Sequence, residues 1–85
     1  MSTPEYRQLC GLYVTYSWIA RAGRHSPAAS AERRLAIAAD EAEIAPRYRQ
    51  VFPHENREIF EVSEILRSRI AALEAEGFRV EDGVD

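Results

Sequence analysis

The prolines and glycines of this sequence divide it into three segments, each with apolar residues at helical spacing. Thr3 followed by Pro4 is typical of a helix start, because a hydroxyl can cap the first turn and proline fits the first helical position. This first helix should end near Gly23. A second Ser-Pro pair, at positions 26 and 27, predicts a second helix over residues 27–45.

Pro46 breaks the regular pattern of the second segment. Because proline lacks an N–H group and clashes with the preceding turn, we expect a kink or an interruption there, followed by a short helical turn over residues 47–52. Pro53 then opens a third helix that runs to Glu76, and Gly77 is expected to cap its C-terminus. The sequence therefore predicts an all-α fold, a small three-helix bundle with a kinked or interrupted second helix.

The length of 85 residues limits the chain to one domain. The composition, 46% hydrophobic and 29% charged, suits a folded globular domain. Cys10 is the only cysteine, so an internal disulfide cannot stabilise the fold. We assign residues 1–80 to a single helical domain and residues 81–85 to an acidic, frayed C-terminal tail.

Residues 12–19 also have the composition of a β-strand, because they are rich in β-branched and aromatic side chains that alternate with polar ones. Such a strand would have only residues 77–80 as a partner. A sheet of two short strands is marginally stable, and helix is therefore the preferred prediction for this segment.

The first helix has apolar residues on two sides. One broad side is assigned to the core and consists of Tyr6, Leu9, Leu12, Tyr13, Tyr16, Ile19 and Ala20. The opposite side carries a second stripe, formed by Arg7, Gly11, Val14, Trp18 and Arg21. Because arginine and tryptophan are enriched at binding hot spots, this stripe is a candidate partner-binding surface. In the alternative interpretation, Trp18 is covered by the loop after the first helix or by the C-terminal tail.

The second helix has two candidate faces. Small residues form a thin face that would let another helix approach closely: Ala31, Leu35, Ala38, Ala39 and Ala42. Ile37 and Ile44 are placed on the far side, which Tyr48 and Val51 would extend if the helix passes Pro46. The middle helix of a bundle can use both faces.

The third helix has the clearest pattern, an apolar seam formed by Ile59, Val62, Leu66, Ile70 and Leu73. Arg69 stands at one seam position where an apolar residue is expected. The seam suits an antiparallel bundle and a coiled-coil-like dimer equally well. Phe60 falls on the opposite side of this helix, where it is a further candidate for contact with a partner.

Residues that could support catalysis or bind a metal are scattered. Cys10 lies in an apolar helix without a neighbouring base, so we interpret it as a buried, inert thiol. His54, Glu55 and Glu58 are interpreted as a solvated cluster. The four glycines do not form a phosphate-binding loop. The sequence therefore predicts no enzyme activity, no cofactor and no metal.

All eleven basic residues are arginine, which we interpret as the codon bias of a GC-rich genome. The formal net charge of −3 disfavours a general binder of nucleic acid. Four arginines nevertheless flank the first loop: Arg21, Arg24, Arg33 and Arg34. They support an alternative hypothesis, a nucleic-acid-binding regulator, although a solvated loop is the simpler interpretation.

The leading hypothesis is a small non-catalytic protein-binding module, such as a regulator, inhibitor or adaptor of a larger bacterial or phage protein. Its partner-binding residues would be Arg7, Val14, Trp18, Arg21 and Phe60. A homodimer through the first or the third helix would use the same surface. The N-terminus lacks the basic region of a secretory signal, and the apolar stretch Leu9 to Ala20 is too short for a bilayer, so we expect a cytoplasmic protein without a membrane segment.

Overall fold

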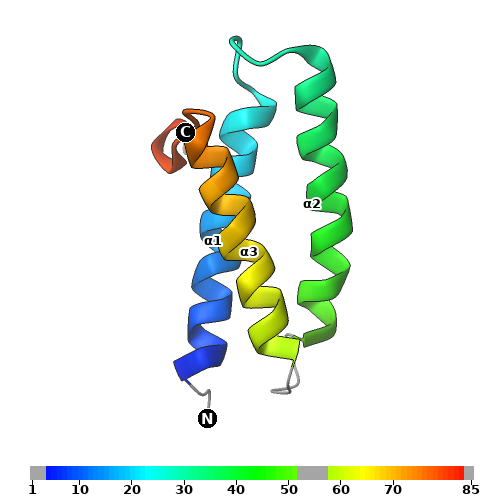
Figure 1. Cartoon of the computed structure of the whole chain (residues 1–85), viewed down its shortest axis with the longest axis vertical. Coiled ribbons are helices and arrows are strands. Elements are labelled where there is room, and N and C mark those ends of the chain that lie inside the picture. The colour runs from blue at the N-terminus through cyan, green and yellow to red at the C-terminus, as the bar shows by residue number, and fades with distance from the viewer. Residues whose placement is uncertain (1–3, 52–57, 84–85) are drawn as a thin grey trace.

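The computed structural model describes residues 4–51 and 58–83. These residues form three α-helices and a short 3-10 helix: α1 (Pro4–Arg24), α2 (Ala31–Val51), α3 (Glu58–Ala75) and η1 (Val80–Gly83). Helices α1 and α3 run in the same direction and α2 runs opposite to both (Figure 1). The protein is an all-α three-helix bundle, as predicted, and residues 12–19 form helix rather than strand.

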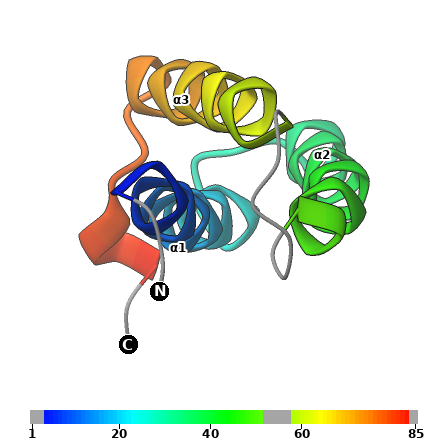
Figure 2. The ribbon, with the colours of Figure 1, turned by 90° about the horizontal axis from the view of Figure 1, so that it is seen from below.

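Helix α1 is the element against which the other elements pack. Seen along the bundle, it lies between α2 and η1, with α3 to one side (Figure 2). Helices α2 and α3 touch each other much less than each touches α1. Side chains of all three helices form one apolar core: Leu9, Tyr16, Ile19, Ala20, Ile37, Ile44, Val51, Ile59, Val62, Leu66 and Leu73.

The core face predicted for α1 is confirmed. Four of its residues are buried, and Tyr6, Leu12 and Tyr13 are half-buried and pack against the core. The ring of Tyr13 stacks on that of Tyr48 in α2, with 4.0 Å between the ring centroids and 3° between the planes. Such offset or stacked aromatic pairs stabilise a fold beyond their buried area, so this pair helps to attach α2 to α1.

Helix α2 begins four residues later than predicted. Ser30 is its N-cap, because the Ser30 hydroxyl oxygen accepts a hydrogen bond from the Arg33 backbone N–H at 3.1 Å. The Ser26 hydroxyl instead accepts one from the Ala28 backbone N–H at 3.2 Å, inside a turn. The prediction of a helix start at Pro27 was wrong because residues 25–30 are needed to reverse the chain between two antiparallel helices.

Helix α2 continues through Pro46 to Val51, so it is not interrupted there. Pro46 is exposed, and the Ala42 carbonyl that loses its N–H partner is on an exposed residue as well. Water can therefore satisfy that carbonyl. The expected end near Ala45 is corrected accordingly, and so is the separate turn expected over residues 47–52, of which residue 52 lies outside the described residues.

The face of α2 that packs on the other helices is not the alanine face that was predicted to let another helix approach closely. Ile37, Ile44 and Val51, at seven-residue spacing, are buried in the core. The alanine stripe faces solvent, and Leu35 within it is 72% exposed. Burial favours the isoleucine and valine side because each of these side chains removes more apolar area from water than alanine does.

Helix α3 uses its predicted seam. Ile59, Val62, Leu66 and Leu73 are buried, whereas Ile70 is half-buried. The expected start at Pro53 lies outside the described residues. Ser63 is also buried, on the side of the helix next to the seam.

Gly77 ends α3 as predicted, with a φ angle of +96°. The Phe78 N–H donates to the Leu73 carbonyl at 3.2 Å, and the Gly77 N–H donates to the Glu74 carbonyl at 2.9 Å. These two bonds are those of a Schellman motif, in which the residue after the glycine folds back on the last turn. The half-buried Phe78 accordingly packs against the core.

The C-terminal segment is ordered as far as it is described. Residues 80–83 form η1, which packs against α1, and Gly83 is buried. Residues 81–83, which were expected to belong to a frayed tail, therefore lie in a short helix on α1. The reason is the turn at Gly77, which directs the chain back across the bundle rather than away from it.

Replacing Gly77 with alanine should lower the free energy of unfolding by about 1–2 kcal/mol, because a β-carbon disfavours the left-handed conformation. Gly11 is the matched control, since its β-carbon position in α1 is open. Alanine at position 11 should raise stability by up to about 1 kcal/mol, because glycine is a poor helix former. Urea unfolding followed by circular dichroism measures both changes. Stabilisation by both substitutions would contradict the cap at Gly77.

Candidate protein-binding surface

The stripe of α1 that points away from the core is called here the α1 outer face, and it consists of Arg7, Gly11, Val14, Trp18 and Arg21. Arg7, Gly11 and Val14 are exposed, and the Val14 side chain is among the large apolar groups most open to solvent, at 53%. Trp18 and Arg21 are half-buried. The structure thus brings four of the five predicted partner-binding residues, all but Phe60, to one side of one helix.

Trp18 and Arg21 interact with each other at the C-terminal end of this face. The Arg21 guanidinium carbon lies 5.8 Å from the centroid of the Trp18 ring, within the range of a cation–π contact. The contact holds both side chains along the helix surface, which lowers the conformational entropy that they would lose on binding a partner.

Helix η1 borders the α1 outer face at Trp18. A β-carbon on Gly83 would overlap the Trp18 carbonyl oxygen and would lie 3.2 Å from the Ala22 amide nitrogen. The backbone of η1 is therefore in direct contact with the backbone of α1. Trp18 is neither a core residue nor a fully exposed one. The alternative interpretation of the sequence placed Trp18 under the C-terminal tail, and in the structure its backbone lies next to the C-terminal segment.

Phe60 lies on a different surface from the rest of the predicted set. Its side chain is 63% exposed and lines a shallow groove together with Arg47, Glu61, Glu64 and Ile65. These residues come from α2 and α3, and none of them comes from α1. The structure therefore does not join Phe60 to Val14 and Trp18 in one surface patch.

The arginines predicted for nucleic-acid binding have partners within the chain. Arg24 pairs with Glu41, and Arg33 pairs with Glu76 through two hydrogen bonds, of which the Nε to Oε1 distance is 2.6 Å. Arg34 Nε lies 3.5 Å from the Ser30 carbonyl oxygen. Acidic partners offset the charges of Arg24 and Arg33, so this end of the bundle is less basic than the sequence indicates.

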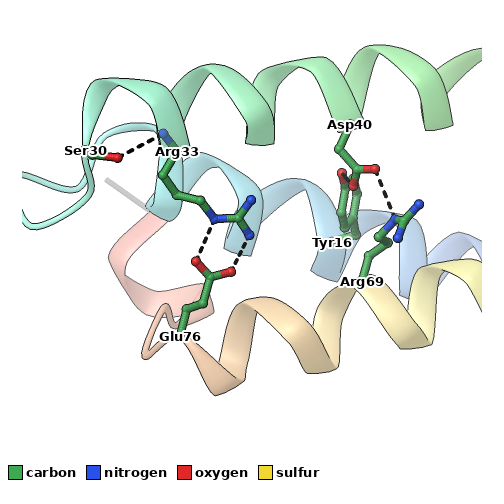
Figure 3. A network of polar contacts seen from close by, with 6 residues as sticks. All are labelled: Tyr16, Ser30, Arg33, Asp40, Arg69 and Glu76. Carbon is green, nitrogen blue, oxygen red and sulfur yellow. Dashed lines mark hydrogen bonds and ion pairs between the residues drawn. The ribbon is translucent and has the colours of Figure 1, made fainter.

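A polar network that the sequence did not predict joins α2 to the other helices (Figure 3). The Tyr16 hydroxyl donates a hydrogen bond to Asp40 Oδ2 at 2.8 Å, and Arg69 Nε lies 3.0 Å from Asp40 Oδ1. Burial and the hydrogen bond to Asp40 raise the pKa of Tyr16. Asp40 thus connects α1 and α3 from α2. The arginine in the apolar seam of α3 was the available sequence signal for this contact.

The single thiol has a tyrosine partner rather than a catalytic base. Cys10 is half-buried, not fully buried as expected, and its sulfur accepts a hydrogen bond from the Tyr48 hydroxyl at 3.4 Å. Burial and the nearby thiol raise the pKa of Tyr48. A raised pKa makes the tyrosine a poor base at neutral pH, so this pair offers no activated nucleophile.

Within residues 4–51 and 58–83, no group of three or more His, Cys, Asp and Glu side chains is arranged to hold a metal ion. His54 and Glu55 of the predicted solvated cluster lie outside the described residues. None of the helices in the described part of the chain combines the length and the apolarity that crossing a membrane requires.

Comparison with known proteins gave no match: no family model fits the sequence, and neither the curated proteins nor the solved structures include a significantly similar chain.

The Arg33–Glu76 pair should make stability depend on acid pH. Hydrogen bonds from Arg33 lower the pKa of Glu76 in the folded chain. Its contribution is therefore present above the unfolded pKa of about 4.3 and is lost as the pH falls through the folded value. Because both side chains are about a third exposed, we expect less than about 1 kcal/mol.

Urea unfolding of the wild-type protein and of Glu76→Gln at pH 7 and pH 3 measures this contribution. The variant should be less stable at pH 7 and should lose less stability between the two pH values. Glu74→Gln, which removes an exposed carboxylate from the same helix end, is the control. Equal losses in the two variants would show that the pair contributes nothing specific.

Proposed function

We propose that this protein is a small non-catalytic protein-binding module of the cytoplasm, which acts by stoichiometric association through the α1 outer face. A regulator, inhibitor or adaptor of a larger bacterial or phage protein acts in this way. The observation that carries the proposal is the pairing of an exposed Val14 with a half-buried Trp18 on a helix that already packs on every other element. The fold does not need these two side chains on the outside.

The charge of α1 supports a protein partner with acidic groups. Glu5 is the only acidic residue of α1, against three arginines, of which Arg7 and Arg21 belong to the α1 outer face. An apolar centre framed by arginines is typical of a binding hot spot, where a few residues supply most of the affinity. A stable interface buries about 800 Å² on each partner, so residues around this face must contribute as well.

The groove at Phe60 is the second apolar surface, and a homodimer is one way to use either of them. The groove at Phe60 holds two glutamates, Glu61 and Glu64, beside one arginine, whereas the charged residues of the α1 outer face are all arginines. The two surfaces therefore favour different partners or different parts of one partner. A substitution in each surface can separate their roles.

Val14→Asp should weaken partner binding at least about tenfold, since a charge would be buried at the centre of the interface. Because the Val14 side chain is 53% exposed, the fold should tolerate this change. Affinity capture from the native host, with quantitative mass spectrometry and light scattering of the purified proteins, compares the wild type with this variant. Circular dichroism confirms that each protein is folded.

Phe60→Asp is the matched variant, since it places the same charge at an exposed apolar site on α3. We expect it to retain the partner that Val14→Asp loses. If both variants retain every captured protein and the same mass in solution, the α1 outer face is not the binding surface.

A further inference from the structure

The four residues of η1 make a close contact with α1 that involves only one apolar side chain, that of Val80. Gly83 is buried, Val80 is half-buried, and Glu81 and Asp82 are exposed. The contact at Gly83 is between backbones, because a β-carbon there would overlap the Trp18 carbonyl oxygen. A short segment whose packing depends on one half-buried side chain and one glycine opens at a lower free energy than the bundle.

The charges of the two segments are complementary. Glu81 and Asp82 of η1 are acidic, whereas the last turn of α1 carries Arg21 and also Arg24, which pairs with Glu41 of α2. Helix η1 therefore combines an acidic turn with a glycine small enough to reach the α1 backbone. These are the properties of a ligand for this part of α1, although the segment belongs to the same chain.

The anchor of η1 lies before it in the sequence. Phe78 packs against the core, and its ring atoms come within 3.3 Å of the β-carbon position of Gly23. The α3 cap, with its bonds to Gly77 and Phe78, does not depend on residues 80–83. Residues 80–83 can therefore leave α1, with the loss of the Val80 packing alone, while α3, its cap and Phe78 remain in place.

We propose that η1 is a displaceable internal ligand of α1, and that the surface at Trp18 binds an acidic, glycine-containing turn of a partner protein in its place. The identity of this surface as a partner site rests on the proposed function. Because the internal ligand is tethered, its effective concentration is high, and an external turn binds more weakly than it would to an uncovered surface.

The full-length Gly83→Ala variant tests the displacement. The added β-carbon overlaps a backbone atom, so the segment has to move away from Trp18. Trp18 is the only tryptophan, so the fluorescence of the protein reports the surroundings of the residue whose backbone Gly83 contacts. We expect emission at longer wavelength and stronger quenching by acrylamide in Gly83→Ala, with the helical circular dichroism retained. Gly11→Ala, in α1 at a site where the added β-carbon meets no other atom, should leave the emission unchanged.

Hydrogen exchange of the wild-type protein provides a measurement that needs no variant. The amides of residues 80–83 should exchange at least about tenfold faster than those of residues 16–20, because they open without global unfolding. Equal protection of the two segments, or unchanged Trp18 emission in a folded Gly83→Ala variant, would overturn the displacement.

A synthetic peptide with the sequence of residues 78–83 tests the class of ligand. Added to Gly83→Ala, it should bind at least about tenfold more tightly than to the wild type and should move the Trp18 emission back to shorter wavelength. The same peptide with alanine in place of its glycine should not bind. Failure of the peptide to bind either protein would overturn the acidic-turn ligand.

These outcomes are distinct from those for the proposed function. If Val14→Asp retains all partners while Gly83→Ala gains the peptide, η1 is a displaceable segment, but the α1 outer face is not the physiological binding surface. If Val14→Asp loses its partner while Trp18 emission is unchanged in Gly83→Ala, the binding surface stands and the internal ligand is wrong.

Discussion

The burial of α1 against three neighbours is the constraint on which the rest of the structure depends. A domain of this size buries only about 60–65% of the surface of its unfolded chain, so its large side chains have to be shared efficiently. Half of the aromatic residues of the chain lie in α1. With Tyr13 facing α2, Ile19 in the core and Trp18 near η1, one helix supplies contacts for every other element. Helices α2 and α3 are held mainly through it.

The attachment of α2 is partly polar as a result. Its apolar contribution comes from side chains such as Ile37 and Ile44, and Asp40 adds contacts to Tyr16 and Arg69. The Tyr16 hydroxyl needs a hydrogen-bond partner once its ring is buried, and a carboxylate that also pairs with an arginine satisfies it. Removing one member of this network would leave a polar group without its partner, which costs more than the net contribution of one hydrogen bond.

The local sequence was sufficient to predict most of the fold. Helices α1 and α3 follow from spacing and caps, because Pro4 and Gly77 act through their own backbone geometry. The side of α2 that faces the core could not be predicted in the same way. Both faces of this helix are apolar, and the neighbouring helices determine which of them is buried. Gly23 leaves space on α1 for Ile37, whose Cδ1 atom lies 2.7 Å from the β-carbon position of that glycine. This complementarity belongs to α1 and could not be read from α2.

The candidate site was predictable to a similar extent. Spacing placed Val14, Trp18 and Arg21 on one side of one helix, but Phe60 could be placed relative to them only in three dimensions. The contact of Gly83 with Trp18 joins residues far apart in the sequence. It depends on two glycines that have different roles. Gly77 supplies the positive φ that turns the chain back, and Gly83 supplies the absence of a side chain where the two backbones meet.

Those two glycines also explain how a covering segment can be both ordered and weakly held. The turn at Gly77 is closed by hydrogen bonds and by the packing of Phe78, so it is as stable as the end of α3. Beyond it, the half-buried Val80 is the one side chain of η1 that packs against the core, and Gly83 contributes no side-chain area to the contact. Conformational entropy opposes holding such a segment in place, and little apolar burial offsets it. A substitution at position 83 should therefore change the position of η1 alone. A substitution at position 77 should change the end of α3 and the position of η1 together.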